Sequence, residues 1–243
     1  MLKKQFERLQ INSSRIYLER FIRRAAQALA PGSLVLDAGA GDSPYQNLFS
    51  HARYESTDLC KVGETDFSHV TYICDLSTIP VKNQSYEMII CTQVLEHVRE
   101  PKAVLHEFNR ILKPGGELWI SAPLFYKEHQ VPYDYYRYTQ YGFRYLLEEA
   151  DFSVRLIEPL EGFYGTLSYQ LAVAAGTLPL NPGKYGGGLT GLLMAACSIS
   201  TKPLFLCLSL LLDRLDLRYK HNRVGYCKNY AAVACKTIQP GVS

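Results

Sequence analysis

Acidic residues and glycines stand where successive strands of a sheet would end. The run from Val35 to Gly41 reads as an apolar strand leading into a Gly-x-Gly turn, and glycine lets a backbone turn tightly and approach a ligand closely. Asp58 and Asp75 end the next two apolar runs, where one acid can accept from ribose hydroxyls and the other from a base amino group. Ligands of open parallel sheets bind at the carboxyl ends of the strands, so the pattern predicts a nucleotide-like ligand. The alternative for Asp58 and Asp75 is a solvated turn.

Pro44 narrows the kind of nucleotide. The dinucleotide-binding fingerprint requires a third glycine at this position, and the chain has Pro44 instead. A pyrophosphate cradle, and with it a nicotinamide-dependent dehydrogenase, is therefore disfavoured.

A second group of reactive side chains lies in residues 129–139. His129 could accept a proton from an acceptor hydroxyl, Asp134 could orient that imidazole, and Arg137 could bind a carboxylate or phosphate of the acceptor. Seven tyrosines between residues 126 and 145 could enclose a sulfonium or a sugar face. The alternative is that Asp134 and Arg137 form a structural pair and that the tyrosines pack against the sheet.

Alternating strands and helices position these residues. Short apolar runs of β-type residues recur at 34–38, about 53–57, 70–74, 86–91, 117–122, 152–158 and 226–236. Amphipathic periodicity predicts helices at 4–29, 101–112 and 139–150, and Pro114-Gly115-Gly116 predicts a turn that ends the second of them. The alternation is typical of an α/β fold with a Rossmann-like, doubly wound and mostly parallel sheet.

Residues 163–212 interrupt this alternation. Lys184 and Lys202 are the only charges in these fifty residues, and Leu189–Leu212 is apolar over 24 residues. A membrane span needs about 20 residues, but Lys202 and Pro203 lie in the middle, and one crossing would separate the last strand from its sheet. We therefore expect a helical hairpin that caps the acceptor pocket and is covered by the protein itself, by a second copy or by a membrane surface. A basic flank that suits anionic lipid follows, made of Arg214, Arg218, Lys220 and Arg223, with Asp213 and Asp216 among them.

Several motifs, found together and in order, resemble the class I S-adenosylmethionine-dependent methyltransferases, and most closely their methyltransferase type 11 group. They are Leu36-Asp37-Ala38-Gly39-Ala40-Gly41, Asp58, Cys74-Asp75-Leu76, Tyr86-Glu87-Met88-Ile89-Ile90, Val94-Leu95-Glu96-His97-Val98 and Leu112-Lys113-Pro114-Gly115-Gly116. The resemblance covers roughly residues 30–158 and the final strand. It implies S-adenosyl-L-methionine as the cofactor, with its methionine end near the first glycines, its ribose at Asp58 and its adenine at Asp75. The cofactor-binding residues implied are Asp37, Gly39, Gly41, Asp58, Leu59, Asp75, Leu76, Thr92 and Gln93. His97 is typical of the family, in either a catalytic or a packing role.

Composition excludes other classes of protein. The chain has 243 residues, 47% of them hydrophobic, and a formal net charge of +3, which argues against disorder. It lacks a long basic run, so nucleic acid is not an expected partner. Its seven cysteines are scattered and never form Cys-x-x-Cys, so we expect no disulfide framework, no metal centre and a reducing cytoplasm. Lys3 and Lys4 precede no apolar stretch of signal-peptide length.

The sequence thus predicts a single-domain methyltransferase that acts on oxygen or nitrogen of a small-molecule, sugar or lipid-linked acceptor. Its expected segments are 1–31 (helical), 32–160 (cofactor-binding core), 161–223 (hydrophobic insert or cap) and 224–243 (last strand and tail). Expected partners besides the acceptor are a membrane surface, reached through 163–223, and a second copy in a homodimer. The alternative is a non-catalytic, membrane-associated interaction protein that retains the nucleotide-binding fold.

Overall fold

The computed structural model describes residues 13–59, 70–222 and 225–237. The chain divides into two compact units, one formed by Tyr17–Leu160 with Asn229–Ser243 and the other by Met1–Ile16 with Glu161–Lys228. The change from one unit to the other at residues 160 and 161 falls where the hydrophobic insert was expected to begin. The first nine residues of the helix predicted at 4–29, and Arg223 of the basic flank, lie outside the described residues.

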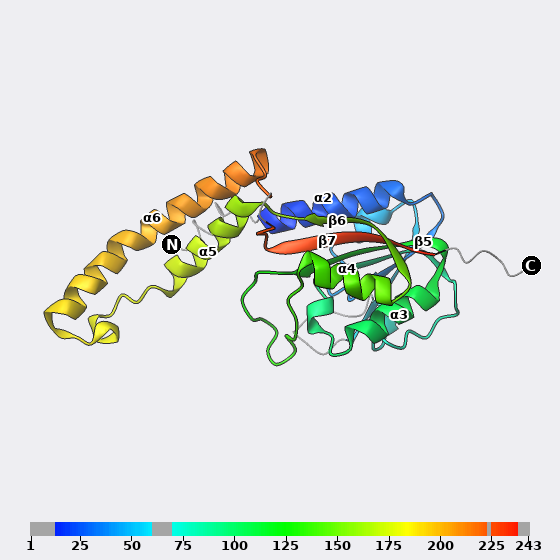
Figure 1. Cartoon of the computed structure of the whole chain (residues 1–243), viewed down its shortest axis with the longest axis horizontal. Helices are drawn as coiled ribbons and strands as arrows, with labels where there is room; N and C mark the ends of the chain where they lie inside the picture. Colours follow the sequence, from blue (N-terminus) through cyan, green and yellow to red (C-terminus); the bar gives the residue numbers. More distant parts are fainter. Residues whose placement is uncertain (1–12, 60–69, 223–224, 238–243) are drawn as a thin grey trace, which may run out of the picture. The chain divides into compact units, whose positions relative to one another are not determined.

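The first unit contains a seven-stranded sheet in the order β3-β2-β1-β4-β5-β7-β6 (Figure 1). Its strands are β1 (Leu34–Ala38), β2 (Arg53–Asp58), β3 (Tyr72–Ile73), β4 (Tyr86–Thr92), β5 (Leu112–Pro123), β6 (Phe152–Pro159) and β7 (Asn229–Lys236). β1 pairs in parallel with β2 and β4, and β4 pairs in parallel with β5, whereas β7 is antiparallel to both β5 and β6. The predicted Rossmann-like, mostly parallel sheet is confirmed.

Three helices cover this sheet. They are α2 (Ser13–Ala28), α3 (Pro101–Ile111) and α4 (Gln140–Glu149), with short 3₁₀ helices η1 (Gln46–Phe49) and η2 (Leu95–His97) between strands. α2 lies on one face and α3 and α4 on the other (Figure 1). On the α2 side the ring of Phe21 packs at a tilt against Trp119 of β5, with ring centroids 5.0 Å apart. On the α3 side the predicted apolar stripe, which includes Phe108, is fully buried, so amphipathic periodicity determines both layers.

Two local predictions differ from the structure. β3 is only two residues long, and Ile73 within it is 66% exposed, because β3 is an edge strand with β2 as its one neighbour. Pro114-Gly115-Gly116 lies inside β5 rather than in a turn before it. The register slips there, since Tyr86 pairs with Leu112 and Met88 with Glu117. The chain therefore bends at these residues, with Gly115 at φ +78°, but it does so within a strand.

The second unit is a helical hairpin, which confirms the predicted helical insert. It consists of α5 (Phe163–Thr177), the 3₁₀ helix η3 (Pro182–Tyr185) and α6 (Gly188–Arg218), with α5 and α6 side by side (Figure 1). Polar groups hold the two helices together, since Ser168 Oγ donates to Ser209 O at 2.8 Å and Gly162 N donates to Asp216 Oδ2 at 3.0 Å. Among the described residues, α6 alone is long and apolar enough to cross a membrane.

The first turn of the sheet generates a stability prediction. Gly39 has φ +78°, and a Cβ built there would overlap the side chain of Val94, whereas Gly32 has φ +77° with nothing within 4 Å of such a Cβ. Alanine at either position adopts a left-handed conformation at a cost of about 1–2 kcal/mol. Gly39→Ala also overpacks the turn, so we expect it to lower the free energy of unfolding by roughly 1–3 kcal/mol more than Gly32→Ala does.

Urea unfolding of both variants measures this difference. In the Gly39→Ala background, Val94→Ala removes the overlapping methyl groups and should restore part of the loss. Equal destabilisation by the two glycine substitutions would contradict the prediction.

Candidate active site

The turn after β1 and the end of β2 form one edge of the candidate site. Gly41 N donates to Asp58 Oδ2 at 3.0 Å, and Gly39 N and Ala40 N both donate to Thr57 O, at 2.8 and 3.1 Å. The structure thus brings together Gly39, Gly41 and Asp58, which the sequence placed on two different strands. Gly41 has φ +51°, and the space beside its Cα is open, so a ligand can approach this turn closely.

Asp37 lies beneath the same edge. Its side chain is 2% exposed and accepts a hydrogen bond from Tyr54 Oη at 2.5 Å. Burial raises the pKa of Asp37 to about 7, although the hydrogen bond from Tyr54 opposes that rise. A cationic group placed beside Asp37 would favour the charged carboxylate.

The residues that the sequence assigned to the adenine side have a different environment. Asp75 is exposed and its Oδ1 accepts from Ser77 N at 2.9 Å and from Ser77 Oγ at 2.8 Å, so it stabilises its own turn. Cys74 N donates to Asp58 O at 3.1 Å, which holds that turn against the end of β2. Leu76 is buried and Leu59 is 38% exposed, so Leu59 is the more accessible to a ligand in this structure.

The residues that follow β4 connect this edge to the neighbouring strand. Gln93 has φ +56°. Its backbone N donates to Ser121 O, and its side-chain amide donates to Ser121 Oγ, both at 3.0 Å. The Thr92-Gln93 turn is thereby fixed to the end of β5.

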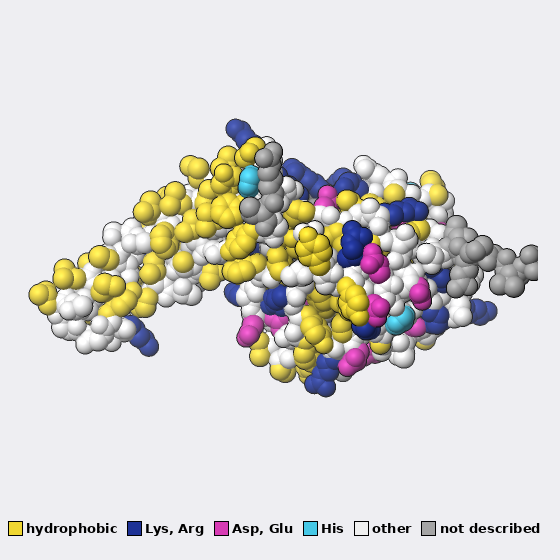
Figure 2. All heavy atoms as spheres, viewed as in Figure 1, with side chains coloured by type: hydrophobic (Ala, Val, Ile, Leu, Met, Phe, Trp, Pro, Cys, Tyr) yellow, Lys and Arg dark blue, Asp and Glu magenta, His cyan; other side chains and the backbone are white. Residues whose placement is uncertain are grey.

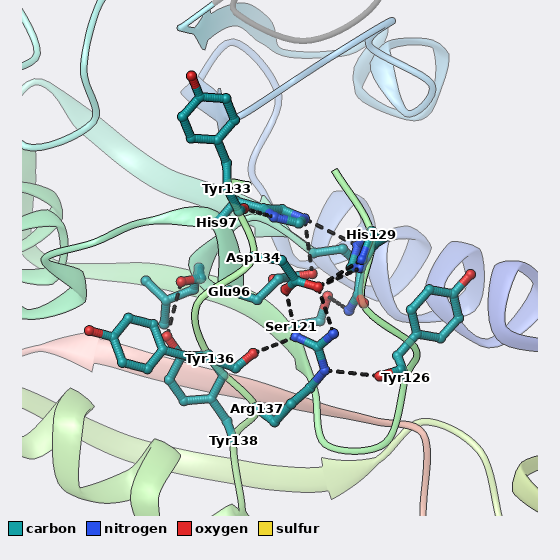
Figure 3. Close-up of polar contacts among 12 residues, drawn as sticks. Glu96, His97, Ser121, Tyr126, His129, Tyr133, Asp134, Tyr136, Arg137 and Tyr138 are labelled. Atoms are coloured by element: carbon teal, nitrogen blue, oxygen red, sulfur yellow. Dashed lines mark hydrogen bonds and ion pairs between the residues drawn. The ribbon is translucent and has the colours of Figure 1, made fainter. Parts of the chain in front are cut away.

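An ion pair organises the loop between β5 and α4. Arg137 Nη1 donates to Asp134 Oδ1 at 2.7 Å, and Nη2 donates to Asp134 Oδ2 at 2.8 Å (Figure 3). The same guanidinium donates to the carbonyls of Tyr126, Lys127 and Tyr136. Arg137 holds the pKa of Asp134 well below its usual range. These contacts give Arg137 a positioning role within the loop, the structural alternative weighed from the sequence.

Asp134 also positions His129. The backbone N of His129 donates to Asp134 Oδ2 at 2.8 Å, and the ring Nδ1 of His129 lies 3.3 Å from the same oxygen. The opposite ring nitrogen, Nε2, therefore points away from Asp134. It lies 3.1 Å from Nε2 of His97 (Figure 3).

His97 and Glu96 complete this group from the 3₁₀ helix after β4. His97 Nδ1 lies 2.5 Å from Tyr133 O, and burial lowers the pKa of His97. The Glu96 side chain has no exposed surface, and burial raises its pKa to about 8. The sequence left the role of His97 open and did not single out Glu96, although Glu96-His97 lies a few residues after a predicted strand end.

Some tyrosines of the loop between β5 and α4 are buried against the sheet, and others are exposed. Tyr138 is buried, and its Oη donates to Leu95 O at 2.9 Å. Tyr126 and Tyr133 are 37% and 41% exposed, and the Tyr126 ring packs edge-on against His129 with centroids 5.1 Å apart. Tyr126 and Tyr133 can therefore contact an acceptor, whereas Tyr138 holds the loop to the sheet.

Two curated relatives match part of the chain. Demethylmenaquinone methyltransferase of Renibacterium salmoninarum is 30% identical over 103 residues, which are 40% of this chain and 44% of the relative. Ubiquinone biosynthesis O-methyltransferase of Klebsiella pneumoniae is 30% identical over 91 residues, which are 37% of this chain and 34% of the relative. The matched stretches thus span less than half the length of these relatives.

A solved structure and a family model match more of the chain. Burkholderia thailandensis 1,6-didemethyltoxoflavin-N1-methyltransferase has the same fold at 15% identity and a TM-score of 0.52, over 89% of this chain and 78% of that one. The family model described as a methyltransferase domain matches residues 9–155, which is more than half of the chain. With the strand order and the glycine turn described above, this match shows that the chain belongs to the class I S-adenosylmethionine-dependent methyltransferases.

Proposed function

We propose that this protein transfers a methyl group from S-adenosyl-L-methionine to an oxygen or nitrogen of a small-molecule, sugar or lipid-linked acceptor. The observation that carries the proposal is the contact between the loop after β5 and the residues after β4. Tyr135 N and Tyr136 N both donate to Glu96 O, so the loop that holds His129 is fastened to the residues directly after β4. This contact supports a single site in which the strand ends would hold the cofactor and the loop would face the acceptor.

The residues at the strand ends fit the cofactor. The open turn at Gly41 admits a ligand, Asp58 can accept from ribose hydroxyls, and buried Asp37 would gain its charge beside the ammonium group of the methionine end. Asp75 and Leu59 are accessible on the side proposed for adenine. When bound, the cofactor supplies a methyl group on a positively charged sulfur.

The loop residues would act on the acceptor. His129 is proposed as the group that activates an acceptor hydroxyl, Asp134 as the residue that positions His129, and Arg137 as the residue that positions both. Methyl transfer in line with a sulfonium requires alignment and exclusion of water more than covalent chemistry, which the exposed Tyr126 and Tyr133 can provide. The names of the two curated relatives refer to demethylmenaquinone and to ubiquinone, and the second name is that of an O-methyltransferase, which supports a quinone-type, lipid-linked acceptor. The non-catalytic alternative gains no support from them.

A membrane surface is the proposed partner of the hairpin. Hydrophobic side chains gather along α6 (Figure 2), and Leu189, Leu193 and Ile199 are 75%, 60% and 60% exposed. The most apolar window of α6 has a mean hydropathy of 1.7, and only 17% of it is buried. An exposed apolar surface of this kind is usually covered by a partner or a membrane. If the enzyme acts at the cytoplasmic face of a membrane, the lipid would cover this surface.

The charges near the end of α6 support the same proposal. Asp213 and Asp216 are 6% and 0% exposed, and Asp213 accepts from Ser13 Oγ at 2.9 Å. Arg214 and Arg218 are exposed on the same helix. The acids therefore point into the hairpin, and the basic side chains can contact anionic headgroups.

Asp58→Ala tests the cofactor site. The change removes the acceptor for Gly41 N and for the ribose, so we expect it to weaken binding of S-adenosylhomocysteine by roughly 1–3 kcal/mol, or about 5–150-fold in Kd. Titration calorimetry measures this, with Glu148→Ala on the exposed face of α4 as the control. Asp58→Asn keeps an oxygen for Gly41 N and should lose less. Unchanged affinity in both Asp58 variants would mean that the ligand binds elsewhere.

His129→Ala tests the acceptor side. We expect transfer of a tritiated methyl group into fractionated cell extract to fall by about 10²–10⁴-fold, with the affinity for S-adenosylhomocysteine nearly unchanged. His106→Ala, an exposed histidine on α3, is the matched control. A fully active His129→Ala variant would leave alignment alone as the mechanism.

Vesicle sedimentation tests the membrane contact. We expect the full chain to sediment with vesicles of phosphatidylcholine and phosphatidylglycerol, and the triple substitution of Leu192, Leu193 and Ile199 by serine to stay in the supernatant. Tyr141→Ser with Tyr145→Ser, which removes exposed apolar side chains of α4, should sediment like the parent. If the parent stays in the supernatant as a dimer and the triple variant is a monomer, a second copy covers α6 and the membrane proposal fails.

A further inference from the structure

Two imidazole rings lie close together at the acceptor loop, and the Nδ1 atom of each has an oxygen atom beside it. His97 Nδ1 lies 2.5 Å from Tyr133 O, and His129 Nδ1 lies 3.3 Å from Asp134 Oδ2. An acceptor beside Nδ1 keeps the proton on that nitrogen. For His97, whose Nδ1 donates to the Tyr133 carbonyl, Nε2 carries a lone pair, and it lies only 3.1 Å from Nε2 of His129 (Figure 3). Two ring nitrogens this close repel each other unless a proton or a metal ion lies between them.

Glu96 adds a buried carboxyl to the same place. Its side chain is fully buried, and among the described residues neither of its oxygens has a hydrogen-bond partner. Oε1 lies 3.8 Å from His97 Nε2. A buried carboxylate is strongly disfavoured without a hydrogen bond, an ion pair or a metal ion. A cation at this place would pair with the Glu96 carboxylate and lie beside both imidazoles.

We propose that Glu96, His97 and His129 bind one divalent transition-metal ion. One oxygen or nitrogen atom from each residue lies within 4.8 Å of the others. Zinc lies about 2.0–2.1 Å from a ligating imidazole nitrogen, so two such nitrogens on one ion are about 2.9–3.4 Å apart at angles of 90–110°. The 3.1 Å between the two Nε2 atoms falls in this range.

The ligand set selects the class of ion. Imidazole suits zinc, iron, cobalt and nickel, whereas magnesium and calcium prefer oxygen ligands throughout. Asp134 would be the carboxylate that orients a metal-bound histidine from behind, and Arg137 holds Asp134 in place. This differs from the expectation of no metal centre, which rested on the cysteines.

Three protein ligands leave at least one coordination position open. If the proposed function is correct, that position fits the oxygen of an acceptor hydroxyl, which makes oxygen rather than nitrogen the atom methylated. His129 would then activate the acceptor through the bound ion, as one of its ligands, because the lone pair of His129 Nε2 would be occupied by the ion.

Metal binding by the full chain tests the site without any acceptor. The protein is stripped with chelator, freed of any affinity tag and titrated with Zn²⁺, and with Co²⁺ as a spectroscopic probe. We expect one ion per chain and visible Co²⁺ absorption bands. Glu96→Gln, His97→Ala and His129→Ala should each weaken Zn²⁺ binding by more than tenfold, and Asp134→Asn by about 10–100-fold. His106→Ala should bind like the parent.

Two results would overturn the proposal. One is less than half an ion per chain in the parent, and the other is equal Zn²⁺ affinity in the parent and in His129→Ala, which changes a partly exposed side chain and should fold. Circular dichroism in chelator shows whether the variant of buried Glu96 is folded. Binding of S-adenosylhomocysteine to the stripped protein is measured separately. If it persists while Zn²⁺ does not bind, the metal inference fails and the proposed function stands.

Discussion

The bidentate ion pair between Arg137 and Asp134 is the interaction on which the proposed acceptor side of this protein depends. Charge-assisted pairs of this geometry are among the strongest hydrogen-bonded contacts in proteins, and the Asp134 side chain is only 3% exposed. The guanidinium also donates hydrogen bonds to three backbone carbonyls of its own loop. A segment with no regular secondary structure thereby acquires a fixed shape, and His129 acquires a fixed orientation within it.

The cofactor side depends on a different constraint, the parallel pairing of β1 between β2 and β4. Parallel pairing brings the carboxyl ends of these strands to the same edge of the sheet. Gly41 and Asp58 then meet through a backbone hydrogen bond. Gly39 makes room for Val94, so the first turn packs directly against the residues that follow β4. The two halves of the site meet at Glu96, whose carbonyl accepts from the acceptor loop.

The hairpin shows how burial changes the meaning of a charge pattern. Along the sequence, acidic and basic residues alternate near the end of α6, and their effects on a lipid surface would partly cancel. In the folded unit, Gly162 N donates to Asp216 and Ser13 Oγ donates to Asp213. A helix of 3.6 residues per turn places residues three apart on one face, so the acids share the inner face while Arg214 and Arg218 are exposed.

The sequence by itself determined the strands and helices whose patterns are local. β1 spans the predicted residues, and α3 and α4 end within one residue of their predicted ends, because periodicity, proline and glycine act over one or two turns of chain. Edge strand β3 and the bend at Pro114-Gly115-Gly116 were predicted less well, since neighbouring strands set their pairing. The glycines and acids at the strand ends could also be found from local sequence patterns. Only the tertiary structure placed Glu96 and His97 against His129. Contacts between residues as far apart in the chain as His97 and His129 arise from packing, and no local spacing encodes which ring nitrogens will lie next to each other.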